Sequence, residues 1–250
     1  AKHVLDPIDI KNGAKSFESA AVARFPLVGQ IMEPGRQFHP KATSVRVQAI
    51  YDADSIAFLV RWHDMKADNA GKNGPSLPVP IEEEEEAAPA PAGQAPDPNN
   101  PFGQDATAPA GGQAGAADPF ASDSADAPAA APSEFSDAIA IQVASQVPVG
   151  ARKPYFIFGD GQNSVDLWFF DLATSSPAQF TGKGSARLTA SDKAEVTGAA
   201  NFDQGEWSVI FKRPLHPATG AAFAQGQFMP VAFSVWDGFA RERGNRRGLS

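Results

Sequence analysis

Two runs of alternating residues constrain the fold of this chain more than any other feature. Residues 44–51 read SVRVQAIY and residues 55–62 read SIAFLVRW, so every second side chain in each run is apolar or aromatic. A period of two is typical of a β-strand that buries one face. Between the runs, Asp52-Ala53-Asp54 supplies residues that favour a tight turn. We therefore predict a β-hairpin over residues 44–62.

The same alternation returns in shorter runs farther along the chain. Predicted strands cover residues 138–143, 155–158, 165–170, 186–189, 194–199, 207–211 and 229–236. No segment keeps the 3.6-residue period of an amphipathic helix. Many short strands separated by Gly and Pro turns are typical of antiparallel sandwiches and barrels. We predict an all-β fold, an antiparallel β-sandwich.

A long segment of different composition interrupts this pattern. Residues 68–133 consist almost entirely of Ala, Pro, Gly, Asp, Glu, Asn, Gln and Ser, and they hold 12 of the 22 prolines. Such a segment has too little apolar surface to offset the entropy of ordering it, so we predict a disordered insert. The insert has eleven acidic residues and one lysine, a net charge of −10, whereas the whole chain carries −8. The net negative charge of the chain therefore comes from the insert.

We predict that residues 1–67 and 134–250 form two parts of the same sandwich. The first part offers one clear hairpin, and a lone hairpin is marginally stable in water. The additional strands that it needs follow the insert. Lengthening a surface loop is inexpensive, because the entropy of loop closure grows only with the logarithm of length.

Composition also excludes several classes of function. The chain has no cysteine, which rules out disulfides, cysteine-ligated metals, a cysteine nucleophile and covalent c-type haem attachment. Its one dense basic cluster, within residues 241–247, is too short to support nucleic-acid binding. No apolar run approaches the ~20 residues that span a bilayer. The first residue is Ala1 rather than Met, as in an exported protein after removal of its signal peptide.

Six phrases occur in an order that resembles a known family. They are RWHD at residues 61–64, FSDAIAIQ at 135–142, KPYFIFGD at 153–160, GEWSVIFKRPL at 205–215, FSVWDG at 233–238 and ERGN at 242–245. Together they resemble the haem-binding γ subunit of ethylbenzene dehydrogenase and the γ subunits of dimethylsulfide dehydrogenase, chlorate reductase and selenate reductase. The resemblance runs from about Phe25 to Ser250, the insert excepted.

This resemblance implies a sandwich related to family-nine carbohydrate-binding modules, with a non-covalent haem b at one end. It implies a periplasmic electron-transfer subunit rather than an enzyme in its own right. The partners implied are the larger subunits of a molybdenum-type or respiratory oxidoreductase and a soluble cytochrome c. Family members usually carry one more strand beyond the position of Ser250, which is consistent with a truncated or fused chain.

The family ligates its haem iron with a Met and a Lys. Met32 is the nearest match to the family Met, although a Met there also suits a core. The Lys position falls on Arg247, whose guanidinium has no lone pair to offer iron. The second ligand would then be Lys212, His39 or His63, or the domain binds no haem. Arg247 would instead pair with a haem propionate, with an acid of a partner, or with solvent.

Aromatic residues raise a related question. Tyr155, Trp168 and Phe170 would suit the wall of a flat apolar cofactor, and they would equally suit a sandwich core. His216 is predicted to be a turn residue, and His3 to lie in a loose terminus. Two functions stay open: a haem-binding electron-transfer subunit, and a non-catalytic binding or assembly module without haem. A hydrolase has no support, because no serine lies in a nucleophile-elbow motif.

Overall fold

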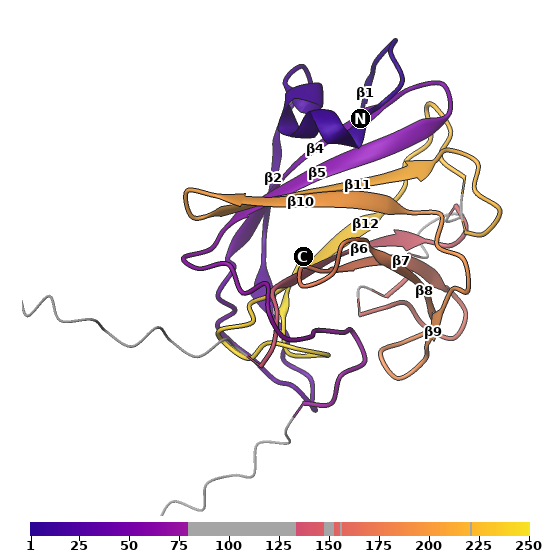
Figure 1. Cartoon of the computed structure of the whole chain (residues 1–250). Helices are drawn as coiled ribbons and strands as arrows, with labels where there is room; N and C mark the ends of the chain where they lie inside the picture. The colour runs from indigo at the N-terminus through magenta and orange to yellow at the C-terminus, as the bar shows by residue number, and fades with distance from the viewer. Residues whose placement is uncertain (80–133, 148–152, 156, 221) are drawn as a thin grey trace, which may run out of the picture. The chain divides into compact units, whose positions relative to one another are not determined.

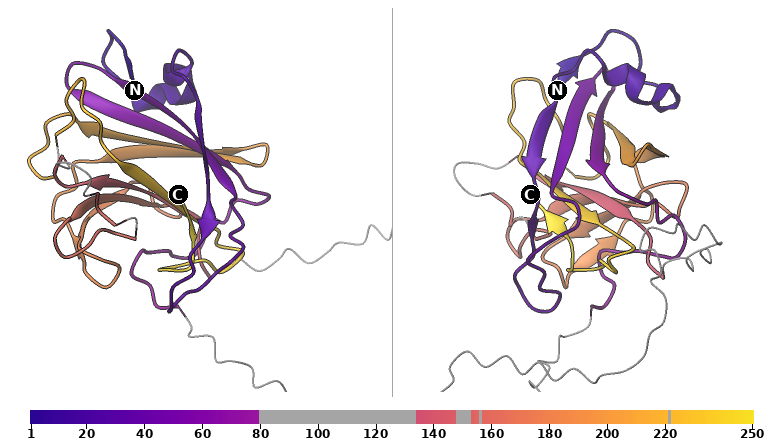
Figure 2. Two further views of the ribbon diagram at one scale, coloured as in Figure 1. Left: turned by 180° about the vertical axis from the view of Figure 1, so that it is seen from behind. Right: turned by 90° about the vertical axis from the view of Figure 1, so that its left-hand side faces the viewer.

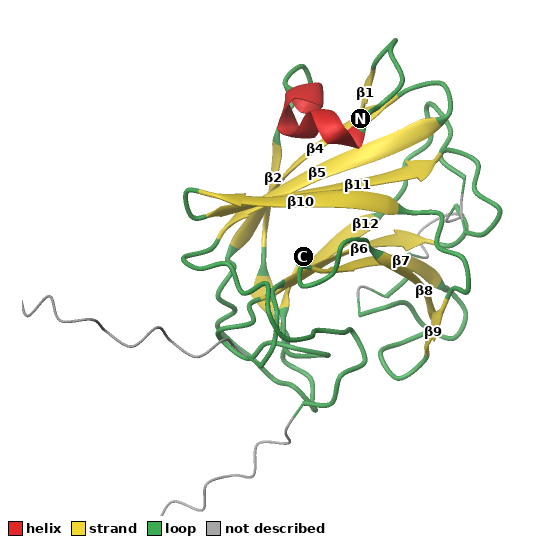
Figure 3. Cartoon of the chain, in the orientation of Figure 1, coloured by secondary structure: helices red, strands yellow, loops and turns green. Residues whose placement is uncertain are grey.

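The protein is an antiparallel β-sandwich. Its computed structural model describes residues 1–79, 134–147, 153–155, 157–220 and 222–250. Two sheets lie one above the other in Figure 1, and the same two layers are visible from the sides in Figure 2. The helical element coloured red in Figure 3 is a short 3-10 segment, η1 (Ile10–Phe17). Among the described residues, no helix has the length and apolar character needed to cross a membrane.

The first sheet has the strand order β1-β4-β5-β11-β10, and β2 also pairs with β4. The pairing of β1 with β4 is parallel and the others are antiparallel. The predicted hairpin is confirmed as β4 and β5. The strand bounds are β1 (Lys2–His3), β2 (Ala23–Pro26), β4 (Ser44–Tyr51), β5 (Ser55–His63), β10 (Thr197–Asp203) and β11 (Glu206–Pro214).

The second sheet has the order β3-β13-β12-β6-β7-β8-β9, and all of its pairings are antiparallel. Its strand bounds are β3 (Val28–Gly29), β6 (Ala138–Ala144), β7 (Val165–Asp171), β8 (Ala178–Gly182), β9 (Leu188–Ala190), β12 (Val231–Trp236) and β13 (Gly248–Leu249). Strands from both sides of the insert meet in each sheet: β5 pairs with β11, and β3 pairs with β13.

Three apolar clusters hold the layers together. The largest lies between the sheets and contains the inward faces of β4 and β5 that the alternation predicts, including Val45, Val47, Phe58 and Trp62. The outer face of the first sheet is covered by η1 and the segment before it. The outer face of the second sheet buries Leu167, Phe169 and Trp236 beneath Phe158. The burial of apolar side chains between the sheets and on both outer faces is the main source of stability in such a fold.

The insert begins later in the structure than the composition suggests. Residues 68–79 are described, and Asn73 is 4% exposed. Its amide Nδ2 donates to the carbonyl oxygens of Ser136 at 2.6 Å and Glu242 at 2.9 Å. The boundary at residue 68 is therefore wrong, because hydrogen bonds rather than apolar area hold this polar segment. The predicted disorder of residues 80–133 falls outside the described residues.

The strand predicted at residues 155–158 is also wrong. The described residues 155, 157 and 158 lie in a loop, in which Phe158 has a φ of 61° and precedes Gly159 with a φ of 77°. The side chain of Gln142 holds the loop, since its Nε2 donates to the Tyr155 carbonyl at 2.9 Å and its Oε1 accepts from the Phe158 N–H at 2.8 Å. This loop places Phe158 on the outer face of the second sheet. Residue 156 lies outside the described residues.

Candidate functional site

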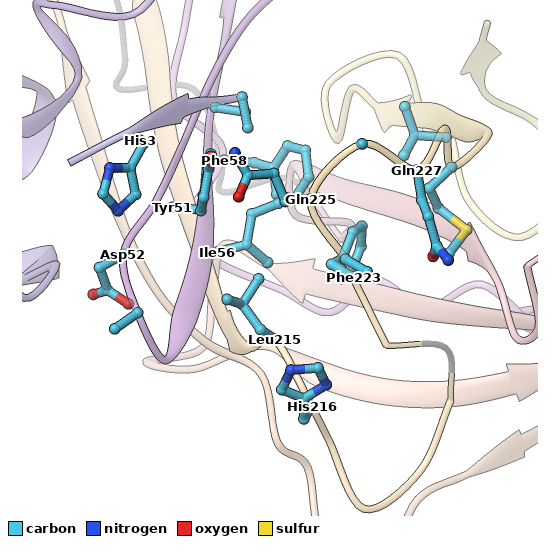
Figure 4. A pocket seen from close by; sticks show the side chains of 17 residues that line it. His3, Tyr51, Asp52, Ile56, Phe58, Leu215, His216, Phe223, Gln225 and Gln227 are labelled. Carbon is cyan, nitrogen blue, oxygen red and sulfur yellow. The ribbon is translucent and has the colours of Figure 1, made fainter.

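One end of the sandwich opens into a cavity of about 850 Å³. The cavity lies where β4 ends and β5 begins, opposite the segment that joins β11 to β12. Its apolar lining comes from the inner faces of these elements, and includes Ile56, Phe58, Leu215 and Phe223. Figure 4 shows Tyr51 and His3 on one side of the opening and Phe223 and Gln227 on the other. A volume of this size is typical of pockets that enclose a small-molecule ligand or cofactor.

A buried carboxylate shapes the β4–β5 side of the cavity. Asp52 Oδ1 accepts from the N–H groups of Asp54 at 2.9 Å and Ser55 at 2.6 Å, and Asp52 Oδ2 accepts from the Ile8 N–H at 2.7 Å. Burial alone would raise the pKa of Asp52, but these hydrogen bonds lower it below its usual value. The carboxylate thus stays ionised and ties the first residues of the chain to the turn.

Hydrogen bonds on both sides of His216 hold the opposite rim. The Leu215 N–H donates to the Asp54 carbonyl at 2.8 Å, and the Phe223 N–H donates to the Leu215 carbonyl at 2.9 Å. The Glu195 carboxylate accepts from the N–H groups of Ala218 at 2.8 Å and Thr219 at 3.0 Å. The backbone around His216 is therefore fixed from several directions.

A buried ion pair links the two sheets behind the cavity. Arg213 Nη1 lies 2.5 Å from Asp166 Oδ2, and the Arg213 guanidinium stacks over the Trp168 ring at 5.3 Å. Asp166 also accepts from Trp168 Nε1 at 3.0 Å and Gln179 Nε2 at 2.8 Å. Burial raises the pKa of Asp166 and lowers that of Arg213, a cost that the direct pairing partly offsets. Arg213 Nη2 donates to the Thr219 carbonyl at 2.8 Å, which anchors the rim to this pair.

Four side chains with donor atoms that haem iron accepts line the cavity: His3, Tyr51, His216 and Met229. The prediction that His3 lies in a loose terminus is wrong, because β1 pairs with β4 and its ring lies 5.1 Å from that of Tyr51. His216 does lie in a connecting segment, as expected. The parallel pairing of β1 joins residues nearly fifty positions apart, so it leaves no local signal in the sequence.

Three of the predicted site residues come together elsewhere, on the outer side of the second sheet. Tyr155 Oη donates to Met32 Sδ at 3.3 Å. Tyr155 belongs to the loop that carries Phe158, and the Arg247 guanidinium lies 4.0 Å from the centre of the Phe158 ring. Met32 is 50% exposed, so it is not a core residue. None of the three lines the cavity described above.

Arg247 is fully buried, and burial lowers the pKa of its guanidinium to about 9. Its Nη1 donates to the Gly244 carbonyl at 2.9 Å. Its Nε and Nη2 have no hydrogen-bond partner among the described residues, and no carboxylate there forms an ion pair with it. The expectation of a solvated tail charge is therefore wrong. A buried cation without an anion is costly, and the faces of Phe158 and Trp236 compensate only in part.

The other predicted site residues lie apart from these two places. Trp168 and Phe170 are 0% and 2% exposed in the core between the sheets, so neither offers a free face to a cofactor. Lys212 Nζ donates to the Ile8 carbonyl at 2.5 Å on the outer side of the first sheet, across the sandwich from Met32. His39 and His63 are exposed, in a loop and at the end of β5. As they stand, Met32 and Lys212 cannot ligate one iron.

Residues from several of the family-like phrases meet at the end of the sandwich opposite the cavity. Asp137 accepts from Trp207 Nε1 at 3.0 Å, from the Gly238 N–H at 2.9 Å and from the Asp68 N–H at 2.7 Å. Carboxylate oxygens of Asp68, Asp137 and Asp237 lie within 4.8 Å of one another. Burial, with the nearby Asp64, raises the pKa of Asp137 to about 7. Both Asp137 oxygens already accept hydrogen bonds, and their donors come from three distant segments. The role of this carboxylate is therefore to hold those segments together.

Glu242 extends this hydrogen-bonded end. Its Oε1 accepts from Gln37 Nε2 at 2.5 Å and the Lys41 N–H at 3.2 Å, and its Oε2 accepts from the Asp237 N–H at 2.9 Å. Burial raises the pKa of Glu242 to about 7. The ERGN phrase thus has a structural role, since its glutamate connects the loops of both sheets.

The fold and cavity define a β-sandwich with a ligand-sized opening at one end. No family model matches the chain. A curated protein of Haloferax mediterranei, provisionally named a respiratory nitrate reductase heme subunit, is 29% identical over 133 residues, which are 52% of this chain and 47% of that protein. The chain thus spans about half the length of this relative.

Two solved structures are similar at low sequence identity. A protein of Bacteroides uniformis, provisionally described as carbohydrate-binding, has 9% identity and a TM-score of 0.47, with 100% of this chain and 86% of that chain covered. A family-nine carbohydrate-binding module of Caldicellulosiruptor kristjanssonii, solved with glucose, has 8% identity and a TM-score of 0.41, with coverages of 98% and 78%.

Proposed function

We propose that this protein is a haem-containing electron-transfer subunit of a respiratory reductase complex, that its haem is of the b type, and that it works outside the cytoplasm. The name of the Haloferax relative supports a haem subunit of such a complex. The structural observation that carries the proposal is the cavity of about 850 Å³, whose lining combines an apolar floor with imidazole and thioether side chains.

The cavity fits the chemistry of a haem. A porphyrin needs broad apolar contact, which Ile56, Phe58, Leu215 and Phe223 offer, and its iron needs His, Met, Cys or Tyr. Because the chain has no cysteine, a haem here is held without thioether links to the protein. When bound, haem would supply a one-electron carrier. The apolar lining would exclude water from it and so influence its reduction potential.

Exposed apolar side chains next to the cavity support a partner protein. Phe228 is 96% exposed and lies between Gln227 and Met229, which line the cavity. Leu5 is 91% exposed, two residues beyond His3. Large exposed apolar side chains near a pocket are typical of docking surfaces. We propose that larger redox subunits, and a soluble cytochrome c, approach the protein on this side.

The test is a visible absorption spectrum of the full chain after expression with ample haem. We expect a Soret band that shifts on reduction with dithionite, and a pyridine haemochromogen of the b type at about one haem per chain. Protein absorbance alone would reject the proposal and favour the second candidate below.

The second candidate is a binding or assembly module without haem. The observation that favours it is Arg247, because it occupies the place to which the resemblance assigns a Lys ligand and has no lone pair for iron. Under this alternative the cavity would take another ligand or a segment of a partner. Titration of the purified chain with haemin separates the two, since the module would show no saturable Soret change.

A further inference from the structure

We propose that a groove on the outer face of the first sheet binds a small organic anion, whose carboxylate pairs with Arg61 and whose hydroxyl groups bond to polar side chains beyond it. The groove measures about 760 Å³ and lies between η1 and the strands β5, β11 and β10 (Figure 3). No residue lines both this groove and the cavity at the end of the sandwich. The inference is therefore independent of haem and goes beyond the proposed function.

A row of polar side chains crosses the outer face of the first sheet. The strand register sets Arg24 opposite Arg46, and Arg46 opposite Arg61. The row continues with Ser208 in β11 and Asn201 in β10. Directly paired residues of antiparallel strands point to the same face, and neighbouring strands lie about 4.8 Å apart. Arg61, Ser208 and Asn201 therefore line the groove one after another.

Positive charge is in excess at the arginine end of this row. Like charges directly opposite each other destabilise a sheet, yet three arginines stand on neighbouring strands. Within the described part of the chain, Glu206 forms an ion pair with Arg46, whereas no carboxylate pairs with Arg24 or Arg61. Burial and the charge of Arg46 both lower the pKa of Arg61. An anion bound to Arg61 would relieve this repulsion.

A neutral partner holds Arg61 in place. Gln48 is 6% exposed, and its Nε2 donates to the carbonyls of Phe17 at 2.8 Å and Ala20 at 2.9 Å. This arrangement leaves Gln48 Oε1 to accept from Arg61 Nη2 at 2.9 Å. The bond fixes the guanidinium without compensating its charge. A positioned guanidinium with further N–H donors suits a carboxylate, because the two groups match as planar, bidentate partners.

Small residues keep the groove open on both sides of this row. They come from η1 and from β10: Gly13, Ala14, Ala199 and Ala200. Gly13 interrupts η1 with a φ of 62°, and a Cβ at this position would meet nothing within 4 Å. The wall of the groove is therefore open at the kink, which leaves room for a ligand above the polar row.

The polar row also indicates the class of ligand. Beyond Arg61, the hydroxyl of Ser208 and the amide of Asn201 can each donate and accept hydrogen bonds, as hydroxyl groups of a ligand require. From Arg61 to Asn201 the row spans two strand spacings, about 10 Å. This length suits an extended molecule with a carboxylate at one end and hydroxyl groups along the rest. A compact inorganic ion would reach Arg61 alone.

The experiment measures binding of gluconate, acetate and sorbitol to the full chain by isothermal titration calorimetry at constant ionic strength. Gluconate has both a carboxylate and hydroxyl groups, acetate lacks the hydroxyl groups, and sorbitol lacks the charge. We expect gluconate to bind at least about tenfold more tightly than acetate, because several hydrogen bonds add to the charged one. Sorbitol should show no saturable binding.

Variants locate the binding. Arg61→Gln should weaken gluconate binding by at least about tenfold, since it removes a charged hydrogen-bond donor. Arg61→Lys keeps the charge, removes the planar fork and should fall between this variant and wild type. Asn201→Ala should weaken gluconate binding and leave acetate binding unchanged. Arg187→Gln is the matched control, because Arg187 is exposed and does not line the groove. Circular dichroism would check that each variant is folded.

The outcomes keep this inference separate from the proposed function. Equal affinities for gluconate and acetate would overturn it, as would wild-type affinity in folded Arg61→Gln. A loss in Arg187→Gln as large as that in Arg61→Gln would also overturn it, since it would show a general effect of charge. The Soret band of the same preparations tests the proposed function, and neither its presence nor its absence affects the gluconate result.

Discussion

The indole Nε1 of Trp207 donates a hydrogen bond of 3.0 Å to Oδ2 of Asp137, and this contact joins the two sheets. Trp207 lies in β11 of the first sheet, while Asp137 directly precedes β6 of the second. Asp137 is fully buried, so its carboxylate depends on such donors for the solvation that it loses on folding.

We predict that Trp207→Phe lowers the free energy of unfolding by about 1–3 kcal/mol more than Trp62→Phe does. Trp62 is the matched control, because its ring stacks on Trp207 at 6.2 Å in the same cluster and its indole does not reach Asp137. Both substitutions remove similar apolar area, so the difference reports the hydrogen bond. Urea denaturation measures it. Equal losses of unfolding free energy in the two variants would show that packing alone accounts for the contribution of Trp207 to stability.

The pH dependence of stability should reflect the buried acids. The folded-state pKa values of Asp137 and Glu242 are both raised to about 7, and that of Asp64 to about 6. Between their ordinary values near 4 and these raised values, the folded state binds more protons than the unfolded chain. Stability is therefore greatest below this window and falls as the pH rises through it. We expect a higher melting temperature at pH 5 than at pH 7.5.

The control for this pH effect is Glu242→Gln, which should flatten the decline in melting temperature between pH 5 and pH 7.5. Acids with lowered pKa values, such as Asp52 and Glu195, act only at lower pH and do not contribute in this range. A melting temperature that rises across the range would contradict the prediction.

The sequence identifies the sandwich because its inward faces alternate. In β4, β5, β11 and β12, period-two alternation coincides with burial between the sheets. The short strands β1, β3 and β13 have two residues each, too few for any periodicity, and their partners are distant in the chain. The loop at Tyr155 and Phe158 is predicted as a strand because its aromatic residues suit one. Its actual conformation, with a positive φ at Phe158, depends on a hydrogen bond to the distant side chain of Gln142.

Two buried arginines should respond in opposite ways to an apolar substitution. Arg213 pairs with Asp166, so Arg213→Met leaves an unpaired buried carboxylate and should cost about 3–5 kcal/mol. Arg247 has no anionic partner among the described residues, so Arg247→Met removes an uncompensated charge and should leave the haem-free protein as stable or more stable. Denaturation midpoints of the two variants test this. Severe destabilisation by Arg247→Met would point to an anion that pairs with it.

Two deletions should separate the acidic insert from the segment that the fold needs. The described residues on the two sides of the insert, within 1–81 and 132–250, fall in one compact unit. Removing residues 82–131 should leave the melting temperature nearly unchanged, because closing a shorter loop costs slightly less entropy. Removing residues 70–131 also takes away Asn73 and its two buried hydrogen bonds, and should lower it by roughly 5 °C or more.

The shorter deletion also tests whether the two flanks form one domain. Cooperative unfolding with a single transition is the expected result. Separate transitions for residues 1–81 and 132–250, or folding of either flank alone, would contradict the single-sandwich prediction.

The candidate site could be predicted only in part. The sequence singles out Met32, Tyr155 and Arg247, and the structure brings these three to one face. The sequence does not indicate the cavity. His3 and His216 both line it because of the order of the strands in the sheet, and no spacing along the chain signals this. Of the family-like phrases, only GEWSVIFKRPL reaches the cavity, through its last residue Leu215, whereas Asp137, Trp207 and Glu242 serve hydrogen bonding at the opposite end.

The first residue of the chain also lines the cavity. Any peptide joined ahead of Ala1, such as an affinity tag, therefore starts at the mouth of the proposed haem pocket and competes with whatever enters it. The last residue, Ser250, follows β13 in the other sheet and hydrogen-bonds to the Phe233 carbonyl. Ligand-binding measurements with and without such an added peptide would show whether it occupies the cavity.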